Sequence, residues 1–303
     1  MQPLNEQFAN VGDVELCYET FGDRSDPALL LIMGLATQMI GWHEDFCRAL
    51  ARRGFFVVRF DNRDIGRSTR FDDVRPPTPI ELLRRRPRSP AYTLDDMADD
   101  AAGLLAYLDI GAAHVVGASM GGMIGQLLAA RHPERVLSLV SIMSSTGRRW
   151  AGQPALKVYP YFLGKPPVGK QEYVDRIVRL FRVVGSPGFE NDEAHLRELA
   201  EVSFDRGTSA AGSARQLAAI IASGNREQYL REIDTPTLVI HGKADRLVRP
   251  SGGKATARAI DGARLMLVDG MGHDLPRELW PKLIDAIAEN AERAPEPATP
   301  RAA

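Results

Sequence analysis

The chain has 303 residues, of which 44% are hydrophobic and 25% charged, and its formal net charge is −1. These values are ordinary for a soluble globular protein and allow one large α/β domain or two small ones. They argue against nucleic acid or an anionic membrane as a partner, and no apolar run approaches the roughly 18 residues of a membrane span.

Two further features of the sequence indicate a cytoplasmic protein. The first residues, Met1–Glu6, lack the basic region and apolar core of a secretory signal. Cys17 and Cys47 fall on a predicted strand and a predicted helix, where we expect two free, buried thiols. A disulfide between them is the alternative that the sequence leaves open.

The first 60 residues alternate strand patterns with one helix pattern. Val11–Phe21 carries two strand signals around a Gly-Asp pair, and its second half alternates as in a half-exposed antiparallel strand at a sheet edge. Ala28–Met33 is a continuous apolar run, as expected for a central strand buried on both faces. A helix over Trp42–Arg53 and a strand over Phe55–Phe60 follow. Strands separated by helices predict a mainly parallel, doubly wound sheet.

Residues 71–92 interrupt this rhythm with several prolines and a run of arginines, namely Arg84, Arg85, Arg86 and Arg88. Such a run can clamp an anionic substrate, but charge runs usually face solvent, so we predict a solvated helical turn on an insertion. Thr93 then caps a helix that extends to Leu108, with Asp95 and Asp96 in its first turn.

The stretch Val115–Gly122 carries the pattern around which the rest of the chain is organised. It begins within a predicted buried strand over residues 114–118 and continues past the end of that strand. It contains Gly117-Ala118-Ser119-Met120-Gly121, a match to G-x-S-x-G. Apolar residues at helical spacing follow, up to Pro133. This strand, turn and helix context predicts a strained turn that lifts the Ser119 hydroxyl clear of the sheet, beside a helix N-terminus. We therefore interpret Ser119 as a nucleophile, not as an incidental serine in a glycine-rich turn.

Val136–Met143 is predicted as another buried strand, after which the α/β rhythm stops. Residues 146–234 carry amphipathic helix patterns, marked by Tyr173, Ile177, Leu180, Phe181 and Val184, by Leu196, Leu199 and Val202, and by Leu217, Ile220 and Ile221. Helices inserted between two strands of an open sheet are expected over the carboxyl ends of the strands, where such sheets bind ligands. We interpret them as a cap and not as a separately folding domain.

The sheet pattern resumes at Thr237–His241 and ends with a strand over Arg264–Val268 and a helix over Leu279–Ala291. The predicted organisation is a core over residues 1–145 and 235–293, the cap over residues 146–234, and a disordered tail over residues 294–303.

The base that would activate Ser119 is sought among the six histidines. Four of them stand on predicted helices, at a helix end or at the far end of the nucleophile strand: His43, His195, His132 and His114. His241 ends a strand, but the glycine after it indicates a packing role. His273 stands in the glycine-rich loop after the last strand, which leaves the sheet at the edge to which Ser119 points. We therefore interpret His273 as the general base.

Asp245 is predicted as the acid that orients this histidine. It follows the strand Thr237–His241 by a short loop, and the strand that ends before Ser144 offers no competing carboxylate. Three other carboxylates are weaker candidates: Asp61, whose charged neighbours indicate a structural network, and Asp269 and Asp274, which flank His273 too closely to face its ring. No metal or organic cofactor is implied by a triad of this kind.

The oxyanion hole is predicted from two backbone N–H groups. One belongs to Met120, the residue after the nucleophile. The other belongs to Leu35, in the loop Met33-Gly34-Leu35 after the first buried strand.

Five motifs, taken in order, resemble those of bacterial α/β-hydrolases: Met33-Gly34-Leu35, Asp61-Asn62-Arg63-Asp64-Ile65-Gly66-Arg67-Ser68, Gly117-Ala118-Ser119-Met120-Gly121-Gly122, His241-Gly242-Lys243-Ala244-Asp245 and Gly270-Met271-Gly272-His273. Many relatives have histidine where this chain has Met33, a change that leaves the backbone donors in place. Within the superfamily the chain is similar to esterases of the aclacinomycin methylesterase type, which remove a methyl ester from a polyketide. The resemblance implies an α/β-hydrolase fold with a helical cap.

The function expected from these residues is that of a serine hydrolase, which cleaves carboxylic esters of small or medium apolar substrates through an acyl-enzyme. Alternatives with the same triad are C–C bond cleavage, lactone opening and perhydrolysis, and a ligand-binding protein of this fold is the alternative outside enzymes. The partner expected is a small-molecule ester. We expect six residues to bind it: Gly34, Trp42, Tyr159, Tyr161, Phe162 and Phe181.

Overall fold

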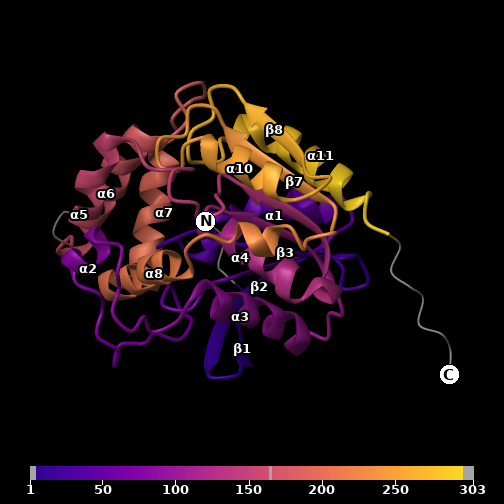
Figure 1. Cartoon of the computed structure of the whole chain (residues 1–303), viewed down its shortest axis with the longest axis horizontal. Helices are drawn as coiled ribbons and strands as arrows, with labels where there is room; N and C mark the ends of the chain where they lie inside the picture. Colours follow the sequence, from indigo (N-terminus) through magenta and orange to yellow (C-terminus); the bar gives the residue numbers. More distant parts are fainter. Residues whose placement is uncertain (1–4, 164–165, 296–303) are drawn as a thin grey trace.

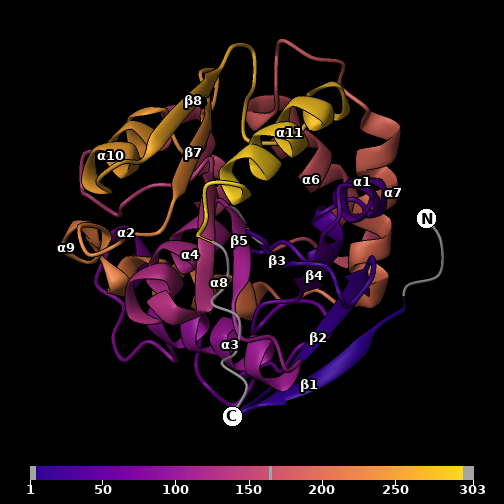
Figure 2. The same ribbon diagram turned by 90° about the vertical axis from the view of Figure 1, so that its right-hand side faces the viewer.

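The computed structural model describes residues 5–163 and 166–295, and its centre is one twisted sheet (Figures 1 and 2). Across this described part the strand order is β1 (Gln7–Val11), β2 (Val14–Phe21), β4 (Phe56–Phe60), β3 (Ala28–Ile32), β5 (Ala113–Ala118), β6 (Val136–Ile142), β7 (Thr237–Gly242) and β8 (Arg264–Val268). β1 and β2 pair antiparallel, as do β2 and β4, and the other neighbours are parallel. The prediction of a mainly parallel sheet is confirmed.

Helices cover both faces of the sheet, which explains why its central strands are apolar throughout. One face packs against α3 (Leu94–Tyr107), α4 (Met120–Arg131) and α10 (Ser251–Ala259), and the other against α1 (Glu44–Arg52) and α11 (Trp280–Ala291). Alternate residues of β3 serve the two sides: Leu30 and Ile32 pack toward α3 and α4, and Leu29 and Leu31 pack toward α1 and α11. Each fully buried leucine of this kind contributes roughly 1.5–3 kcal/mol.

The predicted edge position of the second strand is wrong. β1 forms the edge, so β2 lies one place further in and most of its residues are buried. Two polar groups in its buried part have partners in neighbouring segments. Glu19 accepts hydrogen bonds from Arg59 of β4, and the Cys17 N–H donates to Ser68 Oγ at 2.9 Å. Cys17 and Cys47 are both buried, free thiols.

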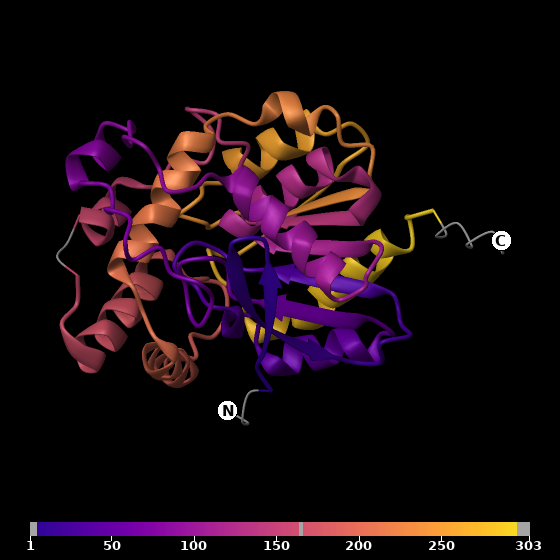
Figure 3. The same ribbon diagram turned by 90° about the horizontal axis from the view of Figure 1, so that it is seen from below.

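The segment between β6 and β7 is helical and lies at one end of the sheet, beside α2 (Pro79–Leu83) (Figures 1 and 3). We call residues 146–234 the cap. Its described part holds η3 (Leu156–Val158), α5 (Tyr159–Leu163), α6 (Gly169–Val184), α7 (Glu193–Arg206), α8 (Ala210–Ser223) and α9 (Glu227–Leu230). The three predicted amphipathic patterns correspond to α6, α7 and α8. Helix α8 ends at Ser223, because the next residue, Gly224, has a φ of 55°, which is incompatible with an α-helix.

Element boundaries differ from the sequence predictions where side chains cap a helix. Helix α1 begins at Glu44 and not at Trp42, because His43 is its N-cap and accepts a hydrogen bond from Asp45 N. At the start of α3 the Asp96 carboxylate accepts hydrogen bonds from Thr93 N and Oγ1. Short 3-10 turns flank four of the elements: η1 (Met39–Gly41), η2 (Pro133–Arg135), η3 and η4 (Arg277–Leu279).

The arginine run is exposed to solvent, as predicted, at Arg84, Arg85, Arg86 and Arg88. Residues 296–303 of the predicted tail lie outside the described residues. No helix within residues 5–163 and 166–295 is both long enough and apolar enough to span a membrane.

Candidate active site

Ser119 occupies the sharp turn between β5 and α4. Its backbone is in the left-handed region, with φ of 56° and ψ of −118°, a conformation that non-glycine residues rarely adopt. The glycines two residues away permit this turn. A Cβ at Gly117 would lie 2.1 Å from the Gly121 carbonyl oxygen, and a Cβ at Gly121 would lie 2.0 Å from the Ile32 carbonyl oxygen. The G-x-S-x-G pattern is therefore a steric requirement of the turn.

The structure brings Ser119, His273 and Asp245 into one chain of hydrogen bonds. His273 Nε2 is 3.0 Å from Ser119 Oγ, and His273 Nδ1 is 2.7 Å from Asp245 Oδ2. The carboxylate can only accept, so Nδ1 carries a proton and Nε2 of the neutral ring is free to accept the serine proton. The three side chains come from the ends of β5, β7 and β8, which meet at one edge of the sheet.

Asp245 is buried but kept ionised by its partners. Its Oδ1 accepts hydrogen bonds from Leu247 N and Val248 N, each at 2.9 Å. Burial opposes ionisation, but the electrostatic interaction with His273 and the hydrogen bonds from His241 and His273 outweigh it, so the pKa of Asp245 is lowered to about 2. His241 Nε2 is 3.5 Å from Asp245 Oδ2 and donates to the Val248 carbonyl at 2.7 Å.

Residues 34–38, here called the oxyanion loop, pass directly over the serine. A Cβ added to Gly34 would lie 3.0 Å from Ser119 Cβ and 3.3 Å from the Ala118 carbonyl oxygen, so glycine lets the loop approach the serine closely without this tight contact. Within the described part of the chain, no protein group accepts a hydrogen bond from Leu35 N–H. Met120 is the first residue of α4, so its N–H has no acceptor inside the helix. Leu35 and Met120 both border the cavity between cap and core.

A cavity of about 1850 Å³ lies between the cap and the carboxyl ends of the strands. Ser119, His273 and the oxyanion loop form its floor on the core side. Five of the six residues predicted to bind substrate line it, namely Gly34, Trp42, Tyr159, Tyr161 and Phe181. The side chain of the sixth, Phe162, lies outside the described residues. Pockets for drug-sized ligands measure roughly 300–1,000 Å³, so this cavity has room for more than one ring.

Two histidines that no sequence pattern connects also line the cavity. His43 at the start of α1 and His195 of the cap helix α7 have ring centroids 4.7 Å apart. Burial, together with the nearby Arg277 guanidinium, lowers the pKa of His43 to about 4, and the pKa of His195 is lowered by the same two causes. Both rings are therefore neutral near pH 7 and join the cap to the core as packed aromatic groups.

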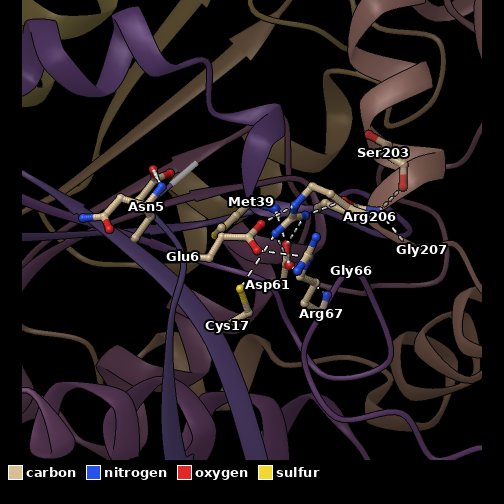
Figure 4. A network of polar contacts seen from close by, with 12 residues as sticks. Asn5, Glu6, Cys17, Met39, Asp61, Gly66, Arg67, Ser203, Arg206 and Gly207 are labelled. Carbon is tan, nitrogen blue, oxygen red and sulfur yellow. Dashed lines mark hydrogen bonds and ion pairs between the residues drawn. The ribbon is translucent and has the colours of Figure 1, made fainter. Parts of the chain in front are cut away.

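Asp61 belongs to a buried network that joins core and cap, as its charged neighbours suggested (Figure 4). Its Oδ2 is 2.8 Å from Arg206 Nη2 at the end of cap helix α7, and Arg206 Nε is 2.7 Å from Glu6 Oε1. A second cap arginine follows the same scheme, because Arg215 Nη2 of α8 lies 2.7 Å from Asp64 Oδ1. Both carboxylates stand in the loop after β4, so two cap helices are fastened to one core loop.

The loop that carries the catalytic histidine candidate is also bonded to the cap, at the connection between α6 and α7. His273 N donates to the Val184 carbonyl at 2.8 Å, and Gly188 N donates to the Gly270 carbonyl at 3.0 Å. Ser186 Oγ accepts from Gly272 N at 2.8 Å and donates to the carboxylate of Asp274. Burial raises the pKa of Asp274 above its usual value, although the bonds to Ser186 oppose this. Asp274 thus faces Ser186 and not the imidazole.

Comparisons with known proteins agree with this architecture. A model of the family described as alpha/beta hydrolase fold matches residues 27–276. The chain is similar to rhodomycin D methylesterase DauP of Streptomyces sp. (strain C5), with 31% identity over 310 residues that cover 93% of this chain and 96% of that protein. It is also similar to 3-oxoadipate enol-lactonase 2 of Acinetobacter baylyi, with 29% identity over 80% of each chain. Among solved structures, the enol-lactonase from Burkholderia xenovorans LB400 has a TM-score of 0.72 at 24% identity, over 95% of this chain and 100% of that one.

Proposed function

The chain belongs to the alpha/beta hydrolase fold family and is a serine ester hydrolase, and we propose that Ser119, His273 and Asp245 are its catalytic triad. The observation that carries this assignment is the unbroken hydrogen-bonded chain from Ser119 Oγ through the imidazole to Asp245, with 3.0 and 2.7 Å separations. The strained turn at Ser119 supports the same role, because it exposes the hydroxyl to the cavity.

In the proposed mechanism, His273 Nε2 takes the Ser119 proton as Oγ attacks the ester carbonyl carbon. The resulting oxyanion accepts hydrogen bonds from Leu35 N–H and Met120 N–H, and the N-terminus of α4 adds a favourable dipole. His273 then protonates the leaving alcohol, which departs and leaves an acyl-serine. His273 deprotonates a water as it attacks the acyl carbon; the bond from that carbon to Ser119 Oγ then breaks, the acid leaves, and His273 returns the proton to Oγ. Asp245 holds the ring in the required tautomer and stabilises the imidazolium in both halves of the reaction.

We propose methyl esters of medium-sized apolar acids as the substrate class. Two observations support this choice. The relative with 31% identity is a rhodomycin D methylesterase, and the cavity is large and bordered by Trp42, Tyr161 and Phe181. Aromatic walls of this kind favour flat, apolar acyl groups. Because methanol occupies little space, the acid of such an ester would take most of the cavity, under the cap formed by residues 146–234.

The setting that fits this function is the cytoplasm. Both thiols are free and buried, which supports a reducing compartment, and a formal net charge of −1 supports a small-molecule partner over nucleic acid.

The decisive experiment measures methanol release from a panel of aromatic and polycyclic methyl esters, with p-nitrophenyl acetate and a lactone for comparison. Wild-type protein should hydrolyse the methyl esters, and a fluorophosphonate probe should label Ser119, as read by peptide mass spectrometry. Ser119→Ala should abolish both signals while the fold persists, since the covalent route is lost. A Ser119→Ala protein that keeps more than a few per cent of wild-type kcat would mean that another nucleophile acts.

A further inference from the structure

The oxyanion loop lacks regular structure that would hold its proposed donor, Leu35. The next residue, Ala36, has a φ of 56°, in the left-handed region that non-glycine residues rarely adopt. Inside the loop, Thr37 N donates to the Gly34 carbonyl at 3.2 Å, and Thr37 Oγ1 donates to the Leu35 carbonyl at 3.1 Å. Oxyanion donors accelerate a reaction because their direction is fixed before charge develops. Whatever fixes this loop therefore takes part in catalysis.

One side chain that reaches the loop from outside is Gln216 of cap helix α8. It is completely buried at the junction of cap and core. Its Oε1 accepts a hydrogen bond from Ala36 N at 2.9 Å, and its Nε2 donates to the Arg63 carbonyl at 2.8 Å. The partners are a fixed donor and a fixed acceptor, so the amide has one possible orientation. Gln216 thus connects the oxyanion loop to the loop after β4, across the boundary between cap and core.

A second connection holds the far end of the same loop (Figure 4). Met39 N donates to Asp61 Oδ1 at 2.7 Å, and Gln38 Nε2 donates to the carbonyls of Ser203 and Gly207 in and beside cap helix α7, at 2.7 and 2.9 Å. Arg206 donates to both Gln38 Oε1 and Asp61. The loop is therefore hydrogen-bonded to two cap helices, to α8 through Gln216 and to α7 through the Arg206 network.

We propose that Gln216 is a positioning residue for ester hydrolysis: its amide holds Ala36, and through it the Leu35 N–H, in the direction that the oxyanion requires. This inference rests on the proposed function, in which Leu35 is an oxyanion donor. Gln216 is not among the residues that border the cavity, so it acts without touching substrate. The cap then contributes to the chemical step as well as to the walls of the cavity.

The test replaces Gln216 by methionine, which has a similar length and cannot accept the Ala36 hydrogen bond well. The matched control is Ser223→Ala on the same helix. Ser223 Oγ also accepts a hydrogen bond from the core, from Leu94 N at 2.9 Å, and neither Ser223 nor Leu94 borders the cavity. We measure kcat and KM for one methyl ester, and inhibition by a trifluoromethyl ketone analogue. Such a ketone forms a serine adduct whose oxyanion occupies the hole.

The expected result for Gln216→Met is a fall in kcat of roughly 10-fold to 100-fold with KM changed less than about threefold, the scale of a misdirected donor. The ketone should bind more weakly by a similar factor. Ser223→Ala should keep kcat and ketone affinity within about twofold of wild type, even if its Tm falls as much as that of Gln216→Met. If Gln216→Met keeps kcat and ketone affinity within about threefold of wild type, or if Ser223→Ala loses them equally, the inference is wrong.

A second variant, Gln216→Glu, covers the case in which the methionine variant does not fold. A neutral carboxyl group has one acceptor and one donor, so it reproduces both hydrogen bonds, whereas the ionised form places a carboxylate oxygen against the Arg63 carbonyl. The ratio of Gln216→Glu to wild-type kcat should therefore rise as the pH falls, and a ratio that stays near one at every pH would contradict the inference. A wild-type protein that neither hydrolyses esters nor binds the ketone would instead refute the proposed function.

Discussion

Replacement of Arg206 by methionine tests how strongly the cap is fastened to the core. The guanidinium is 2.8 Å from Asp61 and 2.7 Å from Glu6, and the Arg206 and Asp61 side chains are 4% and 0% exposed. Removing one partner of a buried ion pair costs about 3–5 kcal/mol, because the other charge is left without compensation. Asp61 would keep hydrogen bonds from Met39 N at 2.7 Å and Arg67 N at 3.1 Å. We therefore expect the lower end of that range, about 3 kcal/mol.

The assay is urea unfolding followed by circular dichroism, with the free energy of unfolding extrapolated to zero urea. The control is Lys170→Met, which removes an exposed ion pair with Asp205 between cap helices α6 and α7 and should cost less than about 1 kcal/mol. In a double-mutant cycle, Arg206→Met combined with Asp61→Asn should cost less than the sum of the two single changes, by about 1–3 kcal/mol. An Arg206→Met protein as stable as Lys170→Met would refute the reasoning that this network carries the cap.

Three further predictions concern the proposed triad acid, a buried histidine and the cavity wall. Asp245→Asn should lower kcat by about 10³–10⁴-fold, because the amide disfavours the required tautomer of His273; a steady-state rate within tenfold of wild type would reassign the acid. Burial lowers the pKa of His114 from 6.5 to about 4, so between these values the unfolded chain binds more protons and stability falls with falling pH, by up to about 1.4 kcal/mol per pH unit. His114→Gln should remove that contribution, and urea titrations with unchanged pH dependence would count against it. Phe181→Ala should reduce kcat/KM for octanoate esters by a factor equivalent to roughly 1–3 kcal/mol, and by less for acetate esters. An unchanged octanoate-to-acetate ratio of kcat/KM would mean that Phe181 does not select the acyl group.

The parts of the site that the sequence predicted best are those that follow from strand ends. Ser119 directly follows a strand, Asp245 and His273 stand in the loops after two others, and parallel strands deliver such residues to a single edge. The glycines around Ser119 carry their own steric signal, since any side chain at Gly117 or Gly121 meets backbone at about 2 Å. Local pattern and topology were therefore sufficient for these positions to be named.

Contacts between cap and core were not predictable in this way. Gln216 meets Ala36 across 180 positions of sequence, and Arg206 meets Asp61 across 145, with no periodicity to indicate either pairing. Helix α10 was missed for a related reason. It begins Ser251-Gly252-Gly253, which reads as a loop, yet added Cβ atoms at these glycines would lie 2.8 Å from the Ser144 carbonyl and 2.4 Å from the His241 ring. The glycines serve tertiary packing, which overrides their low helix propensity.

The bonds between the α6–α7 connection and the His273 loop also restrict how the cap can move. A cap that moved away at that connection would pull Val184 from His273 N and shift His273 relative to Ser119. Opening of the cap at that connection would therefore break these backbone hydrogen bonds. Trp150 and Tyr159 border the same cavity and are 79% and 37% exposed. Exposed side chains change rotamer in picoseconds to nanoseconds, a motion that at these two residues breaks none of the hydrogen bonds between Ser119, His273 and Asp245.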